Sequence, residues 1–135
     1  MSKKFNKVLL VDDDDISNYL TEVLIQKLDF SGEIEVYKNG EEALNHIRDC
    51  IHGHKKKQVP ELVILDINMP VMDGFEFLEE FEKLQKINNM DIPVVMLTTS
   101  NYNNDIQKAQ KYNVAGFVNK PLTEEKFLEI LNHHF

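Results

Sequence analysis

The chain has little cysteine, no long apolar run and no excess of positive charge. Cys50 is the only cysteine among 135 residues, so no internal disulfide can form, and a lone thiol is typical of a reducing compartment. The first apolar run, residues 8–11, is followed at once by four aspartates. It is too short for a signal peptide or a membrane span, so we expect a cytoplasmic protein without a membrane partner.

The acidic charge balance argues against nucleic acid as a partner. Asp and Glu number 23 against 15 Lys and Arg, which gives a formal net charge of -8. Nucleic acid would repel such a surface as a whole, so it is not expected as a partner. The length suits one domain with a single core, and the sequence shows no internal repeat, low-complexity segment or linker. We therefore expect one domain over residues 1–135.

Apolar residues change repeatedly between two spacings along the chain. Short apolar runs typical of buried strands lie at residues 7–11, 34–37, 62–65, 92–97 and 117–118. The helical spacing first appears at Ile16, Leu20, Val23, Leu24 and Leu28. It recurs within residues 43–51, 77–87, 106–113 and 123–133, and Asn39-Gly40 is interpreted as a turn.

This strict alternation predicts the fold. Strands that alternate with helices imply right-handed crossovers and a parallel sheet with helices on both faces. Five βα units indicate an α/β fold of the flavodoxin-like (βα)5 type, a three-layer sandwich whose strand order is 2-1-3-4-5. The carboxyl ends of its strands meet at one edge, where open α/β folds build their sites.

Polar side chains follow four of the predicted strands, at the point where each strand ends: Asp12 and Asp13, Asp66, Thr98, and Lys120. Two carboxylates about 5 Å apart repel by roughly 3 kcal/mol at an effective dielectric of about 20, and three carboxylates make three such pairs. Lys120 offsets only part of this repulsion. Oxygen ligands without a nearby cysteine or histidine favour Mg²⁺, with Mn²⁺ possible.

These residue types suit phosphoryl chemistry. Mg²⁺ commonly bridges one or two carboxylates to a phosphate, which leaves Asp66 as the candidate nucleophile toward phosphorus. Phosphoryl transfer needs neutralisation of three equatorial oxygens, and Mg²⁺, Lys120 and Thr98 can each take one. Asp14 and Asp15 are interpreted differently, as residues at the N-terminus of the first helix that the helix dipole stabilises.

Four fragments carry a resemblance to a known family: Val11-Asp12-Asp13, Leu65-Asp66-Ile67-Asn68-Met69-Pro70, Leu97-Thr98-Thr99 and Asn119-Lys120-Pro121. Through them the chain resembles the receiver domain of two-component response regulators, of the stand-alone chemotaxis-regulator type, over almost its full length. The resemblance implies that Asp66 accepts the phosphoryl group. It further implies that Asp13 is a direct metal ligand, Asp12 a ligand through water, and the main-chain carbonyl of Asn68 a third ligand.

The resemblance also implies a switch. Thr98 corresponds to the switch hydroxyl, Lys120 to the phosphoryl-binding lysine, and Phe117, three residues before the lysine, to the switch aromatic. On phosphorylation Thr98 would move toward the phosphoryl group and let the Phe117 ring turn inward, as a shift between two packings. The alternative for Phe117 is an ordinary core aromatic.

By the same resemblance the partners are a histidine kinase or a histidine phosphotransfer protein. A single receiver domain with no output domain would signal by contact with a downstream protein, as a monomer or weak homodimer, and would be no enzyme beyond autodephosphorylation. Relay of the phosphate and direct docking to a target both stay open. Residues 52–60 resemble the extended loop of some stand-alone regulators that pair with phytochrome-like kinases.

Two other functions compete with a phosphorylated receiver. A phosphohydrolase of the haloacid-dehalogenase type would use the same aspartyl-phosphate chemistry, but it places a second acid two residues after the nucleophile, where this chain has Asn68. A pseudo-receiver would bind partners without phosphorylation, against which the complete site argues. Thr99 departs from the family, where a smaller residue is common. With Asn68 and Ser100 it would set the lifetime of the phosphoaspartate.

Overall fold

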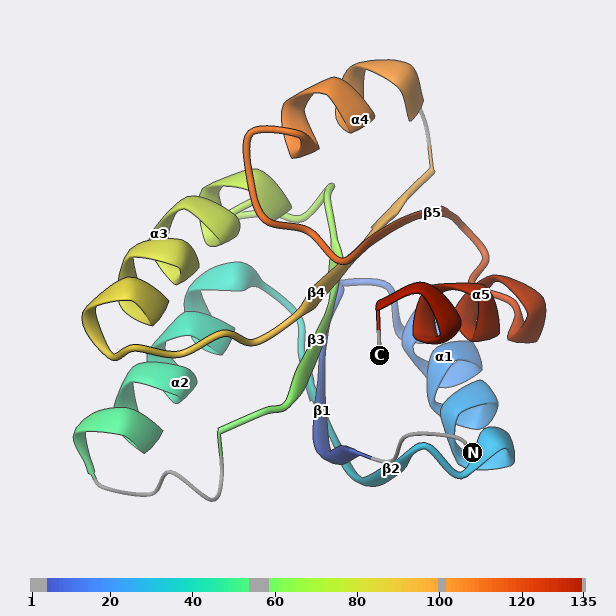
Figure 1. The fold of residues 1–135 in the computed structure, drawn as a ribbon, viewed down its shortest axis with the longest axis horizontal. Helices are drawn as coiled ribbons and strands as arrows, with labels where there is room; N and C mark the ends of the chain where they lie inside the picture. The colour runs from blue at the N-terminus through green and yellow to red at the C-terminus, as the bar shows by residue number, and fades with distance from the viewer. Residues whose placement is uncertain (1–4, 54–58, 100–101, 135) are drawn as a thin grey trace.

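The computed structural model describes residues 5–53, 59–99 and 102–134, in which five strands alternate with five helices (Figure 1). The strands are β1 (Phe5–Val11), β2 (Ser31–Tyr37), β3 (Leu62–Asp66), β4 (Val94–Thr98) and β5 (Gly116–Asn119). The helices are α1 (Asp15–Leu28), α2 (Gly40–His52), α3 (Gly74–Ile87), α4 (Tyr102–Ala109) and α5 (Glu124–His134).

The sheet has the predicted topology. Its strand order is β2-β1-β3-β4-β5 and all four neighbouring pairs are parallel, which confirms the flavodoxin-like α/β fold. The sheet runs through the middle of the molecule, with α2 and α3 on one side and α1 and α5 on the other (Figure 1). This places every strand's carboxyl end at one edge.

The central part of the sheet is built from largely apolar strands because it is covered on both faces. Along β1, Leu9 and Val11 belong to the core on the α2 and α3 side, whereas Val8 and Leu10 belong to the core on the α1 and α5 side. All five residues of β3 and all five of β4 are buried. Strands buried on both faces have nearly continuous hydrophobic sequences, and these apolar runs are what located the strands in the sequence.

Polar caps set the starts of three helices. The Asp14 side chain accepts a hydrogen bond from the Ile16 N–H at 3.1 Å, so Asp14 is the N-cap of α1, as interpreted from the sequence. Asp73 caps α3 in a capping box. The interpretation of Asn39-Gly40 as a turn was wrong, because Asn39 is the N-cap of α2 and Gly40 its first residue.

Some predicted boundaries differ from the structure. β2 begins at Ser31 rather than Ile34, because this edge strand is only partly buried and its first residues carry no apolar pattern. β4 begins at Val94 rather than Ile92, after Pro93, which has no N–H to donate to a neighbouring strand. α2 extends through His52, and residues 54–58 of the predicted loop lie outside the described part of the chain.

The exposed surface of α1 is unusually apolar. Four large hydrophobic side chains on this helix are exposed: Ile16 (71%), Tyr19 (66%), Leu20 (53%) and Val23 (44%). The buried positions are instead Asn18, Thr21 and Ile25. The helical spacing therefore predicted the helix. Three of the five apolar residues that define this spacing, Ile16, Leu20 and Val23, are nevertheless exposed. Among the described residues, no helix is long and apolar enough to cross a bilayer.

A buried ion pair joins β1 to β2 and α2. Lys7 is 4% exposed, and its Nζ lies 3.1 Å from Glu35 Oε2. The other carboxylate oxygen of Glu35 lies 2.7 Å from His46 Nε2, and the Cys50 thiol, also buried, lies 3.6 Å from the same nitrogen. Lys7 and Glu35 lie within β1 and β2, before the carboxyl ends of these strands, so we interpret these contacts as structural.

Candidate functional site

Three carboxylates converge at the carboxyl edge of the sheet. One oxygen each from Asp12, Asp13 and Asp66 lie within 4.8 Å of one another. The parallel register pairs Val11 with Leu65, so the strands β1 and β3 end side by side and deliver Asp12 and Asp66 to neighbouring positions. Asp12 is 3% and Asp66 4% exposed, whereas Asp13 is exposed. The predicted acidic cluster is therefore present.

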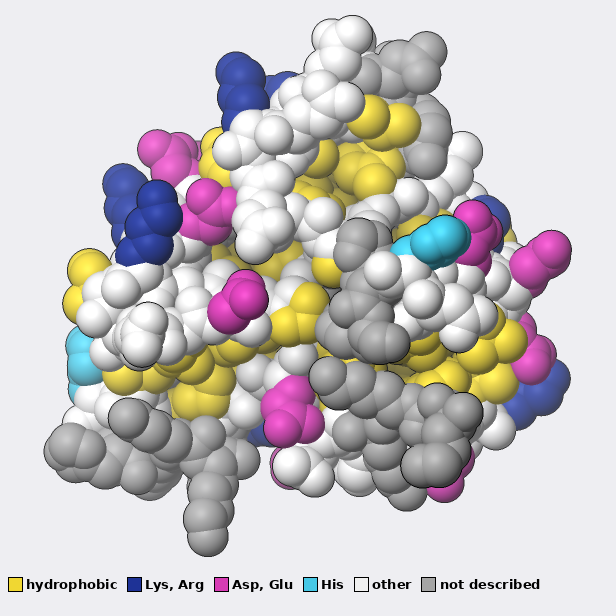
Figure 2. All heavy atoms as spheres, in the orientation of Figure 1, with side chains coloured by type: hydrophobic (Ala, Val, Ile, Leu, Met, Phe, Trp, Pro, Cys, Tyr) yellow, Lys and Arg dark blue, Asp and Glu magenta, His cyan; other side chains and the backbone are white. Residues whose placement is uncertain are grey.

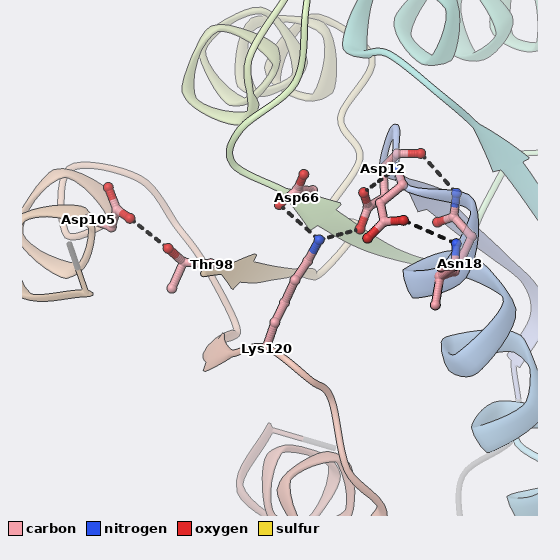
Figure 3. Close-up of polar contacts among 8 residues, drawn as sticks. Asp12, Asn18, Asp66, Thr98, Asp105 and Lys120 are labelled. Carbon is pink, nitrogen blue, oxygen red and sulfur yellow. Dashed lines mark hydrogen bonds and ion pairs between the residues drawn. The ribbon is translucent and has the colours of Figure 1, made fainter. Parts of the chain in front are cut away.

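Hydrogen bonds from the start of α1 hold Asp12 in place. The Asn18 side chain donates from Nδ2 to the Asp12 carbonyl at 2.9 Å, and the Asp14 N–H donates to Asp12 Oδ1 at 2.9 Å (Figure 3). Asn18 is buried. Sequence reasoning missed this residue. Its polar side chain amid the apolar positions of α1 was the only signal.

Lys120 bridges two of the carboxylates. Its Nζ lies 2.8 Å from Asp12 Oδ2 and 3.4 Å from Asp66 Oδ1 (Figure 3). The Lys120 N–H donates to the Thr98 carbonyl at 2.7 Å, which fixes the lysine backbone beside the end of β4, and the Lys120–Pro121 peptide is cis. Burial alone would lower the pKa of Lys120, but its contacts with Asp12 and Asp66 outweigh burial and raise that pKa. The lysine therefore stays charged.

Asp66 is the carboxylate with a strongly shifted pKa. The pKa of Asp66 is raised from 3.8 to about 6: burial contributes most, the charge of Asp12 adds to the rise, Lys120 partly opposes both, and Asp13 adds a smaller rise. One ammonium thus does not neutralise the cluster. An oxygen-only set of clustered carboxylates fits Mg²⁺ or Mn²⁺, and a bound divalent ion would favour the ionised form of Asp66.

The loop after Asp66 is tightly constrained. The Gly74 N–H donates to the Ile67 carbonyl at 2.8 Å, and a Cβ at position 74 would lie 2.6 Å from the Asp66 carbonyl oxygen. Only glycine fits there. Val71 has a φ of 71°, in the left-handed region that β-branched residues rarely adopt. The loop therefore carries backbone strain beside the carboxylate cluster.

Thr98 lies at the end of β4 but its hydroxyl is turned away from the carboxylates. The residue is completely buried, and its Oγ1 donates to Asp105 Oδ2 on α4 at 2.7 Å (Figure 3). Met96 pairs with Phe117 and Thr98 with Asn119, so Thr98 and Phe117 lie on the same face of the sheet. Phe117 is partly buried and packs against the core on the α2 and α3 side.

Two more predicted residues are exposed on loops. Asn68 and Thr99 follow β3 and β4 and are both exposed, while Ser100 lies outside the described residues. The ligand role of the Asn68 carbonyl and the switch role of Phe117 stay predictions. The structure brings together Asp12, Asp13, Asp66 and Lys120, and adds Asn18 and Asp105, which the sequence did not indicate.

A parallel five-stranded sheet with this polar edge is the architecture of chemotaxis-regulator-like proteins. The sequence matches the response regulator receiver domain over residues 8–132, so the chain belongs to that family. The resemblance inferred from the four sequence fragments is thereby confirmed.

Curated relatives include regulators of similar length and much longer proteins. The chain is 33% identical over 118 residues to the probable methanogenesis regulatory protein FilR2 of Methanothrix harundinacea, covering 87% of this chain and 74% of that one. It is 28% identical over 133 residues to the two-component response regulator ORR41 of Oryza sativa subsp. japonica, covering 97% and 95%. Against a hybrid signal transduction histidine kinase of Dictyostelium discoideum it spans only 7% of that protein.

Solved structures show the same similarity. A two-component response regulator from Cytophaga hutchinsonii is 30% identical with a TM-score of 0.82, and the match covers 97% of each chain. The bacteriophytochrome response regulator AtBRR is 29% identical with a TM-score of 0.74, covering 97% of this chain and 93% of that one. The Vibrio cholerae chemotaxis protein CheY4 is 27% identical with a TM-score of 0.70, covering 96% and 98%.

The strain at Val71 is testable. The substitution Val71→Asn should raise the free energy of unfolding by roughly 0.5 to 1 kcal/mol, because asparagine tolerates the left-handed conformation and the exposed valine side chain loses little packing. Thermal and urea denaturation measure the change. Val71→Ile keeps the β-branch and should leave stability unchanged; a Val71→Asn protein no more stable than the isoleucine variant would contradict the strain.

The repulsion at Asp66 predicts a pH-dependent gain from its removal. In metal-free buffer at neutral pH, Asp66→Asn should raise the free energy of unfolding by about 1 to 2 kcal/mol, because the amide removes a buried charge facing Asp12. Since folding raises the pKa of Asp66 from 3.8 to about 6, the wild type loses stability as pH rises through that window. Urea denaturation across pH with a chelator present measures the gain, which should vanish below about pH 4. A less stable variant at neutral pH would contradict the repulsion.

Proposed function

We infer that the chain is a receiver that accepts a phosphoryl group on Asp66 in a Mg²⁺-dependent reaction and signals by contact with another protein. The observation that carries this proposal is the convergence of Asp12, Asp13 and Asp66 with Lys120 at the carboxyl edge of the sheet. A histidine kinase or a histidine phosphotransfer protein would supply the phosphoryl group. The proposed location of the protein is the cytoplasm, where such partners and Mg²⁺ are present.

The proposed reaction is an in-line displacement at phosphorus. An oxygen of the ionised Asp66 carboxylate attacks the phosphorus of a phosphohistidine, a new O–P bond forms, and the N–P bond breaks with its electron pair returning to the imidazole nitrogen, which then takes a proton. Lys120 already contacts Asp66 and can donate to a transferred oxygen. Its charge would stabilise the phosphoryl group on the product side.

Mg²⁺, when bound, would neutralise charge on the phosphoryl oxygens and the carboxylates. Asp13 is proposed as its direct ligand, Asp12 as a ligand through water, and the Asn68 carbonyl as the third protein ligand, with Mn²⁺ as a substitute. The Asn18 and Asp14 hydrogen bonds to Asp12 would keep that carboxylate in place through the reaction. Thr98 is the proposed switch hydroxyl and Phe117 the proposed switch aromatic.

The exposed side of α1 is the proposed contact with the phosphodonor protein. This helix begins directly after the carboxylate cluster, so a histidine aimed at Asp66 brings its own protein over the first turns of α1. Ile16, Tyr19 and Leu20 offer apolar surface there. On the face drawn in Figure 2, described Lys and Arg side chains are scattered among Asp and Glu, so no basic stripe suggests a nucleic acid instead.

The proposed unit of function is the receiver domain over residues 1–135, which is not an enzyme beyond autodephosphorylation. A monomer or weak homodimer is proposed. The alternative is a pseudo-receiver that binds partners without being phosphorylated, and phosphorylation itself separates the two.

The acceptor role is tested by intact-protein mass spectrometry after acetyl phosphate treatment, with and without Mg²⁺. Wild type should gain one phosphoryl group only when Mg²⁺ is present, and Asp66→Asn should gain none, because no carboxylate remains at the nucleophile position. Lys120→Arg should keep the charge yet slow the gain, since the guanidinium has a different shape. No adduct on wild type would favour the pseudo-receiver, and steady turnover of small phosphate esters would favour a phosphohydrolase.

The α1 contact is tested by separating protein and small-molecule donors. Replacing Ile16 and Leu20 together by Gln should slow phosphotransfer from a phosphohistidine protein about tenfold or more, because apolar anchors at an interface are lost. Phosphorylation by acetyl phosphate should stay unchanged. Ile87→Gln, at an exposed hydrophobic residue at the end of α3, is the control. Equal rates for the double variant and this control would contradict the contact.

A further inference from the structure

The last turn of helix α4 contacts the rest of the domain through described side chains. Of its described side chains, Ala109 in the last turn is the buried one. Lys108 Nζ lies 4.7 Å from the centre of the Phe75 ring, and Tyr112, just after the helix, stacks on the same ring. Nearer the N-terminal end, the described polar contact to the sheet is the hydrogen bond between Asp105 and Thr98.

This hydrogen bond uses the one proton that the Thr98 hydroxyl can donate. A threonine hydroxyl carries a single O–H donor, and here it is directed to Asp105 Oδ2 at 2.7 Å (Figure 3). To bind an oxygen of a phosphoryl group on Asp66, the same O–H must turn toward the carboxylate cluster. Asp105 and the phosphoryl group are therefore competing acceptors for one donor. The bond to a carboxylate is charge-assisted, which makes Asp105 an effective competitor.

We propose that Asp105 is a positioning residue that holds the Thr98 hydroxyl away from Asp66, so that phosphorylation of Asp66 releases the N-terminal half of α4. The inference rests on the proposed acceptor role of Asp66. Capture of the hydroxyl by the phosphoryl group breaks the Thr98–Asp105 bond, and by linkage, breaking that bond favours the phosphorylated state by the same free energy. Asp105 thereby sets both the affinity for the phosphoryl group and the mobility of α4.

Beryllofluoride with Mg²⁺, an analogue of the phosphoryl group, measures this competition without a kinase. Asp105→Ala should bind beryllofluoride roughly tenfold more tightly than wild type, since a hydrogen bond to a charged group no longer opposes binding. Asp105→Asn keeps an acceptor oxygen for Thr98 but loses the charge, so its gain should be smaller. A simple charge effect would give equal gains for both variants.

Two further variants separate the Thr98 contact from other effects. Glu125→Gln removes one exposed carboxylate from α5 and should leave the affinity unchanged. In a Thr98→Ala background, Asp105→Ala should have no effect on beryllofluoride affinity, because there is no hydroxyl left to release. An equal gain with and without the Thr98 hydroxyl would overturn the proposal.

Hydrogen exchange of the α4 backbone amides supplies the second readout. In wild type, Mg²⁺ and beryllofluoride should speed exchange in the first turns of α4. In Asp105→Ala, exchange should already be fast without them. If wild type binds beryllofluoride while the Asp105 variants match Glu125→Gln in affinity and exchange, the positioning role alone is wrong. If wild type neither binds beryllofluoride nor accepts phosphate, the acceptor role of Asp66 falls and this inference with it.

Discussion

Mutual repulsion among three carboxylates is the constraint on which the rest of this structure depends. Asp12 and Asp66 are buried and lie close to Asp13, and the single ammonium of Lys120 does not cancel three negative charges. The raised pKa of Asp66, about 6, is the direct expression of that imbalance. Such an imbalance favours binding of a divalent cation, and the proposed phosphorylation of Asp66 depends on that cation and on Lys120 to offset the negative charge of the phosphoryl oxygens.

The fold enforces this arrangement with rigid elements. The register between β1 and β3 fixes where two of the carboxylates emerge, and Asn18 and Gly74 lock the segments that follow each strand. In the proposed mechanism the response to phosphorylation occurs at α4. Among the described side chains of α4 only Ala109 is buried, and the hydrogen bond from Thr98 to Asp105 is the contact through which the proposed switch acts. A rigid acceptor site and a helix whose hydrogen bond to β4 can break would be the two parts of this proposed switch.

Much of this was predictable because it follows from burial. Strands covered on both faces read as apolar runs, and their order then placed Asp12, Asp66 and Lys120 together. Periodicity could not predict which side of α1 is buried, since Asn18 faces inward for its hydrogen bond while Leu20 stays exposed. The Asp105 contact was equally hidden, because a lone acid on a polar helix carries no pattern; only the tertiary structure brings it to β4.

The most direct test of the central claim is Mg²⁺ binding measured by isothermal titration calorimetry on wild type, Asp13→Asn and Asp12→Asn. If the carboxylate cluster is a cation site, wild type binds one Mg²⁺ per chain, Asp13→Asn loses that binding, and Asp12→Asn weakens it. Binding that survives both substitutions, or no binding to wild type at all, would contradict the claim that carboxylate repulsion is relieved by a divalent cation at this edge of the sheet.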